Sequence, residues 1–228
     1  MQERLNMLLK KYGVTTAATL VDDRSAAIDG KQIPLLPWRY ERRFEELKKL
    51  VDSKTVDGIS VFRIISIGRK TDSMEELLTR ELDVCRYVLS TEIKEVFAIR
   101  NGAALNVSLK LENGVVCTIE LATTLPEAEE RISKHEVITA RGIACDMNVD
   151  TQVMQSSVYV YGDKSQKYTD VDYELFGLDI VSVSTVRAAC AAAKEPAVRD
   201  LFVNESAAIA KLVAAVKQSA ETLDNIIL

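Results

Sequence analysis

Apolar side chains recur along this chain with two different spacings, and the change between them predicts both helices and strands. Spacings of three and four residues place apolar side chains on one face of a helix, whereas strict alternation places them on one face of a strand. The helical spacing predicts helices over residues 2–12, 38–53, 73–89, 178–194 and 205–223. Alternation, with many valine, isoleucine and threonine residues, predicts strands over residues 14–21, 59–66, 93–100, 105–111, 115–121, 135–145 and 153–161.

The later strands follow one another without an intervening helix. Asn113-Gly114 stands between two alternating runs, which is the strongest local signal for a β-hairpin. Strands joined by hairpins form an antiparallel sheet, and the helices outside this run must then cover one of its faces. The sequence therefore predicts an α+β fold with a largely antiparallel open sheet that is covered on one face by helices.

The periodic pattern stops once, between residues 22 and 37. This segment holds Asp29-Gly30, Pro34 and Pro37, which favour turns, so we expect a loop and an internal boundary here. Pro196 is expected to end the helix before it, and Asn204 or Ser206 to cap the last one.

The composition narrows the range of functions. The 228 residues carry a net charge of −5 and include only 9 glycines and 4 prolines, as in an ordinary globular protein. The acidic balance disfavours nucleic acid and anionic membranes as partners. The chain begins Met-Gln-Glu-Arg and has no apolar run of about 18 residues, so neither a signal peptide nor a membrane span is expected. We expect a soluble, cytoplasmic protein.

The common catalytic and cofactor-binding motifs are missing. The sequence has no GxGxxG, GxxxxGK[ST], GxSxG or HExxH, so we expect no bound cofactor and no metal. His135 is the single histidine, and it stands between Lys134 and Glu136 in a strand pattern. A solvated or hydrogen-bonded structural role is favoured for it over catalysis. The cysteines form no CxxC pair and fit buried, reduced thiols: Cys85, Cys117, Cys145 and Cys190.

One side of the predicted helix 73–89 carries polar groups that suit a ligand. At about 100° per residue, this side holds Glu76, Arg80, Asp83 and Tyr87, away from the apolar stripe. Such a row can orient a polyhydroxylated or anionic ligand if it faces a cleft. In the alternative, the row is a solvated face on which Glu76 and Arg80 form an ion pair worth about 0.2–0.5 kcal/mol.

Two further patterns concern partners. Residues 39–49 contain five basic side chains interleaved with three glutamates, which favours a solvated helix face over a nucleic-acid patch. Tyr159 and Tyr161 share one face of their strand, with Tyr168 close in sequence. That face suits either a subunit interface or packing under a helix.

Longer segments carry a resemblance to a known family. They are, in order, WRYERRFEELKKLVDSKTVDGISVFRI, ELLTRELDVCRYVLSTEIKEVFAI, VSLKLENGVVCTIELATT, KHEVITARGIACDM and FVNESAAIAKLVAAVKQSAETLDNIIL. Residues 38–228 thereby resemble the C-terminal domain of the Gfo/Idh/MocA oxidoreductases (glucose–fructose oxidoreductase, inositol dehydrogenase). Residues 1–37 begin with LNMLLKKYGVTTAATLV, which resembles the last helix and strand of that family's dinucleotide-binding domain, followed by a loop.

The resemblance also implies what this chain lacks. The rest of the dinucleotide-binding domain, with its glycine fingerprint and the Glu-Lys-Pro segment that carries a catalytic lysine, has no counterpart in the sequence. Aligned on LDVCRY, the family's proton-transferring Asp and His fall at Glu76 and Arg80, and an arginine does not release its proton at ordinary pH. Because the family's sheet commonly forms the subunit interface, a homodimer through the open sheet face is expected.

Three functions stay open. In the first, the chain is an oxidoreductase-family C-terminal domain protein that is not catalytic alone and binds a small polar ligand. In the second, it is a component or fragment of an NAD(P)-dependent sugar or polyol dehydrogenase whose cofactor-binding subunit is a separate chain or has been removed. In the third, only the fold is shared and the chain binds a partner protein.

Overall fold

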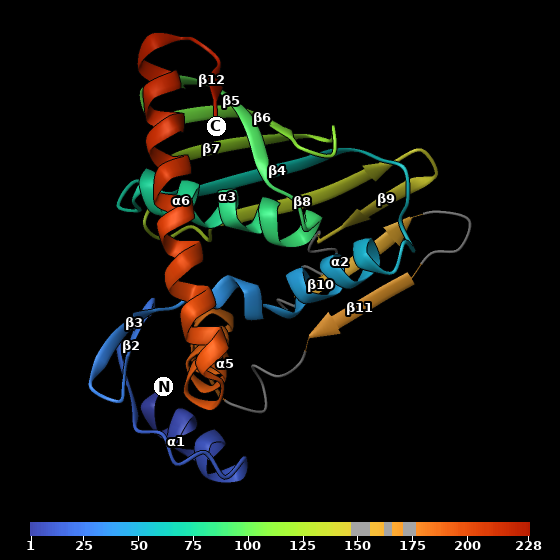
Figure 1. Ribbon diagram of the computed structural model, residues 1–228. Coiled ribbons are helices and arrows are strands. Elements are labelled where there is room, and N and C mark those ends of the chain that lie inside the picture. Colours follow the sequence, from blue (N-terminus) through green and yellow to red (C-terminus); the bar gives the residue numbers. More distant parts are fainter. Residues whose placement is uncertain (147–155, 162–165, 171–176) are drawn as a thin grey trace. The chain divides into compact units, whose positions relative to one another are not determined.

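The computed structural model describes residues 1–146, 156–161, 166–170 and 177–228 (Figure 1). By their internal contacts these residues divide into two units. Unit 1 comprises Met1–Glu45 and Asp170–Ala208, and unit 2 comprises Glu46–Thr169 and Ile209–Leu228. The boundary expected after residue 37 concerns the family resemblance and stays a prediction.

Unit 1 is a small α+β body built around one apolar helix. Helix α5 packs against α1, against the short helix η1 and against strands β1 and β2. Helix α1 directs Leu5, Leu8 and Leu9 into this core. The elements are α1 (Gln2–Lys11), β1 (Ala18–Asp22), β2 (Ser25–Ile28), β3 (Lys31–Pro34), η1 (Pro37–Tyr40), α5 (Ile180–Lys194) and the first part of α6 (Pro196–Thr222).

The prediction of a loop between residues 22 and 37 is wrong, because this segment forms β2 and β3, two of the three strands of a small sheet. Strands β2 and β3 form a hairpin in which Ile28 pairs with Lys31. Asp29 and Gly30 between them have φ angles of 49° and 77°, and two positive φ values are what a type I′ hairpin turn requires. Pro34 is tolerated because β3 is an edge strand of this sheet.

Unit 2 is dominated by one large open sheet. Its nine strands lie in the order β11-β10-β9-β8-β4-β7-β6-β5-β12. The described strands are β4 (Ile59–Arg69), β5 (Ile93–Asn101), β6 (Ala104–Leu111), β7 (Val116–Leu125), β8 (Ile132–Thr139), β9 (Gly142–Cys145), β10 (Ser156–Tyr161), β11 (Gln166–Asp170) and β12 (Ile226–Ile227). Its helices are α3 (Met74–Leu89), the C-terminal part of α6 and most of α2 (Arg42–Asp52).

The sheet is largely antiparallel, with β4 at its centre. This strand pairs parallel with β7, where Val61 lies opposite Val116, and antiparallel with β8, where Ile64 lies opposite His135. The neighbouring strand pairs β5–β6, β6–β7, β8–β9 and β9–β10 are all antiparallel. The α+β class and the largely antiparallel open sheet predicted from the sequence are therefore confirmed.

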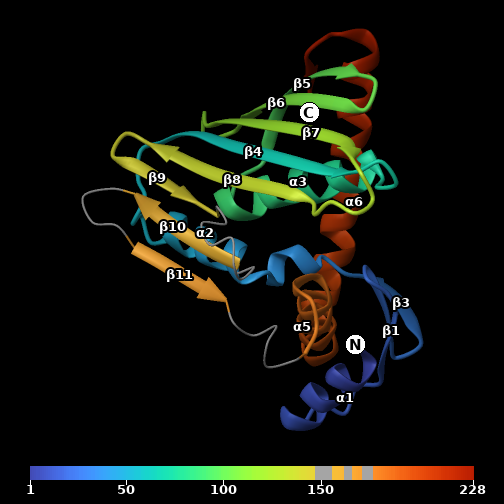
Figure 2. The same ribbon diagram turned by 180° about the vertical axis from the view of Figure 1, so that it is seen from behind.

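The two faces of the sheet differ. Helix α3 and the C-terminal part of α6 lie on the same face, as the front and back views agree (Figures 1 and 2). Side chains that point to this face are buried, for example Phe62, Ile64 and Val137, all 0% exposed. The residues between them are half-buried or exposed. Alternation along each strand thus sets the burial of the unit 2 core.

Local signals placed several element ends correctly and missed others. The Asn113-Gly114 hairpin forms as predicted, with Gly114 at φ 84° and the Val115 amide bonded to Asn113 Oδ1 at 3.1 Å. Helix α5 ends before Pro196, but α6 begins at Pro196 and not at residue 205, because proline suits the first helical turn.

The strand expected over 135–145 is a hairpin of two strands. Part of the strand expected over 153–161 lies outside the described residues.

Candidate functional site

Helix α3 carries the polar residues singled out from the sequence. Its N-terminus is capped by Ser73, whose Oγ accepts a hydrogen bond from the Glu76 amide at 3.3 Å. Its C-terminus ends at Ser90 in the left-handed conformation. The helix packs on β4 and β7 through an apolar stripe that includes Leu78, Leu82 and Cys85. The helix therefore belongs to the core of unit 2.

The four residues predicted to face a ligand occupy different depths. Glu76 is exposed, the Arg80 side chain is 20% exposed, and Asp83 is fully buried. Tyr87 is half-buried, and the ammonium group of Lys48 lies 5.4 Å from its ring centre. The row thus runs from solvent into the protein and is not a uniformly solvated helix face.

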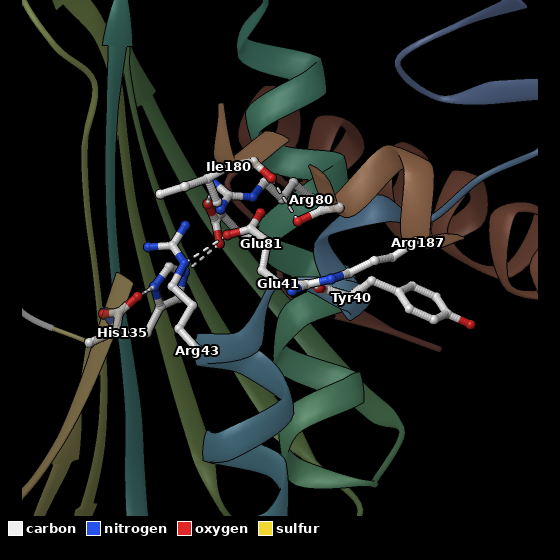
Figure 3. Close-up of polar contacts among 10 residues, drawn as sticks. Tyr40, Glu41, Arg43, Arg80, Glu81, His135, Ile180 and Arg187 are labelled. Atoms are coloured by element: carbon white, nitrogen blue, oxygen red, sulfur yellow. Dashed lines mark hydrogen bonds and ion pairs between the residues drawn. The ribbon is translucent and has the colours of Figure 1, made fainter. Parts of the chain in front are cut away.

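Arg80 connects this row to a deeper cluster. Its Nη1 lies 3.4 Å from Oε1 of Glu81, a carboxylate that is itself 0% exposed (Figure 3). A partly exposed guanidinium next to a buried carboxylate can still present N–H groups to an anion from solvent. Arg80 thus combines partial exposure with a contact to the buried cluster.

Behind Arg80, three buried titratable side chains form a chain of hydrogen bonds. His135 on β8 contacts Glu81 of α3 through Nε2, at 2.8 Å from Oε2 (Figure 3). Its Nδ1 lies 2.7 Å from Oδ2 of Asp146, which follows β9. All three side chains are buried. We call Glu81, His135 and Asp146 the buried triad. It joins α3 to the hairpin of β8 and β9, and Glu81 and His135 are 54 residues apart in the sequence.

The carboxylates determine the charge state of the histidine. Burial alone lowers the pKa of the His135 imidazole, but the charges of Asp146 and Glu81 and their hydrogen bonds outweigh burial and raise this pKa above its ordinary value. The imidazole is therefore stabilised in its protonated form. The hydrogen-bonded structural role expected for His135 agrees with this geometry, although the side chain is buried and not solvated.

The Cys117 thiol next to the triad is protonated and unreactive. Burial, a hydrogen bond with Cys85 and the charge of Glu81 raise the pKa of the Cys117 thiol well above its ordinary value. A raised pKa keeps the thiol protonated and unreactive. All four cysteines are free and buried, so the expectation of buried thiols is confirmed, and their reduced state stays a prediction.

Unit 1 has its own polar cluster at η1. Glu41 is buried and accepts a hydrogen bond from Nε of Arg43 at 2.7 Å (Figure 3). The Arg43 guanidinium also lies 4.5 Å from the Phe44 ring centre. Arg187 of α5 donates to the Tyr40 carbonyl at 3.2 Å. Burial, with the charges of Glu45 and Glu195, raises the pKa of Tyr40 to about 12. These contacts join η1 to α5 and indicate a structural role.

The buried triad was missed by sequence reasoning, although two signals were present. Glu81 stands three residues after Leu78 and four before Cys85, so helical spacing places it on the buried stripe of α3. His135 alternates with Val137 and so shares the buried face of β8. A charged residue at an apolar position of a helix and a histidine at an apolar position of a strand suggest a buried pair.

Two classes of feature have no support in the described part of the chain. No three His, Cys, Asp or Glu side chains among its residues are arranged to hold a metal ion. Within the same residues, no helix combines the length and the apolar character that a membrane crossing requires.

Comparison with solved structures identifies the fold. An oxidoreductase from Agrobacterium radiobacter, in complex with NAD+, L-tartaric acid and magnesium, superimposes with a TM-score of 0.65 at 12% identity over 84% of this chain. An inositol dehydrogenase homolog from Azotobacter vinelandii, with NADH and myo-inositol, gives 0.63 at 12% identity over 85%. A super-repressor mutant of Gal80p from Saccharomyces cerevisiae gives 0.66 at 12% identity over 86%.

The similarity covers only part of these proteins. The chain spans 63% of the first two and 64% of the third. No family model and no curated protein sequence matches it. The chain therefore has the fold of part of an inositol-dehydrogenase-like oxidoreductase, which confirms at the level of the fold the resemblance to the C-terminal domain of the Gfo/Idh/MocA proteins.

Proposed function

We propose that this chain is a C-terminal domain protein of the oxidoreductase type that is not catalytic alone and binds a small, anionic, hydroxylated ligand at α3. The ligand meets Arg80, with Glu76 at the exposed end of the row and Tyr87 beyond it. Asp83 is fully buried, so we do not include it among the residues that contact the ligand.

The observation that carries this proposal is the position of Arg80. Its guanidinium is partly exposed and lies against the buried carboxylate of Glu81. A guanidinium recognises carboxylates through paired N–H donors but does not exchange a proton at ordinary pH. Binding without proton transfer is the chemistry that this side chain supports.

The ligands bound in two similar structures are suitable test compounds. One carries L-tartaric acid and another carries myo-inositol. Tartrate is an anion and inositol is neutral, so the pair tests whether the charge of Arg80 matters. A super-repressor of the same fold agrees with a role in binding and regulation for this chain.

Calorimetric titration with L-tartrate and with myo-inositol tests the ligand class. We expect tartrate to bind and inositol to bind more weakly. Arg80→Gln should reduce tartrate affinity by at least tenfold, whereas the control Arg100→Gln, on the exposed end of β5, should leave it unchanged. Equal tartrate affinity in Arg80→Gln and in the unchanged protein would contradict the proposed site.

The same method tests whether the chain on its own binds a nicotinamide cofactor. We expect no binding of NAD or NADP. Micromolar affinity for either of them contradicts the non-catalytic proposal, because a cofactor site would then be present.

We also infer that the face of the sheet opposite α3 joins two copies of the chain. Along the strands from β4 to β10, this face carries a band of half-buried or exposed apolar side chains: Val61, Ile65, Ile67, Ile132, Ile138, Ile143, Tyr159 and Tyr161. The Tyr159 and Tyr161 rings stack with centres 6.2 Å apart. A band of this kind favours association with another protein surface. The side chain of Tyr168 lies outside the described residues.

A second candidate is a subunit that works with a separate dinucleotide-binding chain. Unit 1 exposes large apolar side chains on α1 and directly after it, on β1 and on α5: Met7, Tyr12, Val21 and Val181. Such a surface suits the docking of a further domain. NAD binding that requires both chains, with neither binding it alone, would favour this candidate.

A further inference from the structure

The geometry of the buried triad sets how many protons its two contacts hold. Each ring nitrogen of His135 faces a carboxylate oxygen at 2.7 or 2.8 Å, and each of these contacts needs one proton between its two atoms. A neutral imidazole has a single N–H. The two contacts therefore hold two protons in all, as in an imidazolium between two carboxylates. When one proton leaves, one contact becomes a nitrogen lone pair facing a carboxylate.

The two contacts are not equivalent, because Asp146 is attached to β8 independently of the ring. Its Oδ1 accepts a hydrogen bond from the His135 backbone amide at 2.5 Å, and its own amide donates to the His135 carbonyl at 3.2 Å. Asp146 is thus fixed beside Nδ1. Glu81 contacts β8 through Nε2 of the His135 ring. Its other carboxylate oxygen faces Arg80 of its own helix.

Charges around the ring favour the same asymmetry. The charges of Asp146 after β9 and of Glu81 on α3 both act on the imidazole. The Arg80 guanidinium lies beside Glu81, and burial raises the pKa of the nearby Cys117 thiol, which keeps that thiol neutral. Lys134 and Glu136 on either side of His135 pair with each other at 2.6 Å, and Ile64 and Phe62 of β4 are apolar neighbours.

We infer that the buried triad is a protonation-controlled latch: loss of one proton breaks the contact between His135 Nε2 and Glu81, which frees α3 from β8, while Asp146 stays bonded to Nδ1. The latch does not require a ligand. Its consequence for ligand binding rests on the proposed function, because α3 carries Arg80 and the other residues of the row.

Nuclear magnetic resonance tests the latch directly, because His135 is the single histidine and gives one set of imidazole signals. The protein, without ligand, is titrated upward from pH 6, and the ring ¹⁵N shifts and the backbone amide signals are followed. We expect the ring to change from doubly protonated to the Nδ1–H tautomer. The α3 amides near Glu81 should shift with the same midpoint, and those of β9 should shift less.

Two variants separate the latch from a general effect of charge. In Glu81→Gln, the side-chain amide can accept from Nε2–H or, after rotating, donate to its lone pair, so α3 should no longer shift with the ring. The control Glu75→Gln removes a charge from the same helix at a side chain that is 59% exposed, and α3 should still follow the ring there.

Four results would overturn the latch: an Nε2–H tautomer after deprotonation, α3 signals that stay unchanged through the midpoint, α3 signals that still follow the ring in Glu81→Gln, or a ring that keeps both protons until the whole protein unfolds. None of them bears on ligand binding. Conversely, failure of tartrate to bind leaves the titration of the triad unaffected, so the two proposals fail separately.

Discussion

Nε2 of His135 lies 2.8 Å from Oε2 of Glu81, and both side chains are 0% exposed. This contact links the centre of α3 to the sheet through polar, ionisable groups, in addition to the apolar packing of the helix on β4 and β7. Breaking a buried charge pair by removing one partner typically costs about 3–5 kcal/mol, since the remaining charge is left buried and unpaired.

Glu81→Ala should therefore destabilise the protein by about 3–5 kcal/mol. Glu81→Gln should cost less, because the amide keeps a hydrogen bond to the ring. Urea denaturation followed by circular dichroism measures both. Glu75→Ala, on an exposed part of the same helix, should change the free energy of unfolding by less than about 0.5 kcal/mol. A loss in Glu81→Ala no larger than in this control would contradict the buried contact.

The stability should fall with rising pH on the alkaline side of neutrality. The pKa of His135 is raised in the folded state, so its contribution is fully present below the unfolded value of about 6.5 and is lost as the pH rises through the folded value. Denaturation curves between pH 6 and pH 10 measure this slope. In His135→Gln the slope should be smaller, and an equal slope in both proteins would assign the effect to other groups.

The ion pair between Asp72 and Arg131 should make a smaller, pH-dependent contribution to stability at acidic pH. Two hydrogen bonds of 2.6 and 2.7 Å join the carboxylate to the guanidinium. The Arg131 side chain holds the pKa of Asp72 below its ordinary value. That contribution is present above about pH 3.9 and is lost as the pH falls through the folded value.

The variant Arg131→Gln should lose about 0.2–1 kcal/mol near neutral pH, and this difference should shrink as the carboxyl becomes protonated. Thermal denaturation from pH 7 down to pH 3 measures it. A difference that grows on acidification would show that Arg131 acts through another partner.

Ser219 links α6 to the edge of the large sheet. Its buried Oγ accepts a hydrogen bond from the Ala98 amide at 2.9 Å and donates to the Asp224 carbonyl at 2.7 Å. Ser219→Ala leaves the buried Ala98 amide without this acceptor, which should cost about 1–3 kcal/mol. The exposed neighbour Gln218 gives the control Gln218→Ala, and chemical denaturation of the two variants should separate them clearly.

The open face of the sheet predicts self-association. Ile132 on β8 is 50% exposed, so Ile132→Glu should leave the fold intact but disrupt a dimer formed through this face. Sedimentation at several concentrations is the measurement. Val181→Glu, at an exposed position of α5, is the matched control and should stay dimeric. A protein that is monomeric at every concentration, before any substitution, removes the proposed interface.

Much of the fold could be predicted from local patterns, and so could the burial of Glu81 and His135, whereas the contact between these two residues could not. Alternation located the sheet strands because one face of each strand is buried, and Asn113-Gly114 fixed a hairpin. The sequence does not predict strands β2 and β3, because Asp29-Gly30 and Pro34 favour a loop. Glu81 and His135 are 54 residues apart, and only the pairing of β4 with β8 and the packing of α3 bring them together. No local spacing encodes that contact.

The central position of β4 also affects how the chain folds during synthesis. This strand leaves the ribosome before either of its neighbours, since Val61 pairs with Val116 and Ile59 with Thr139. Both edges of β4 stay unpaired until β7 and β8 have been made. Its isoleucine-rich stretch is exposed during that interval, so a nascent chain of this protein should bind chaperones most strongly before β8 emerges.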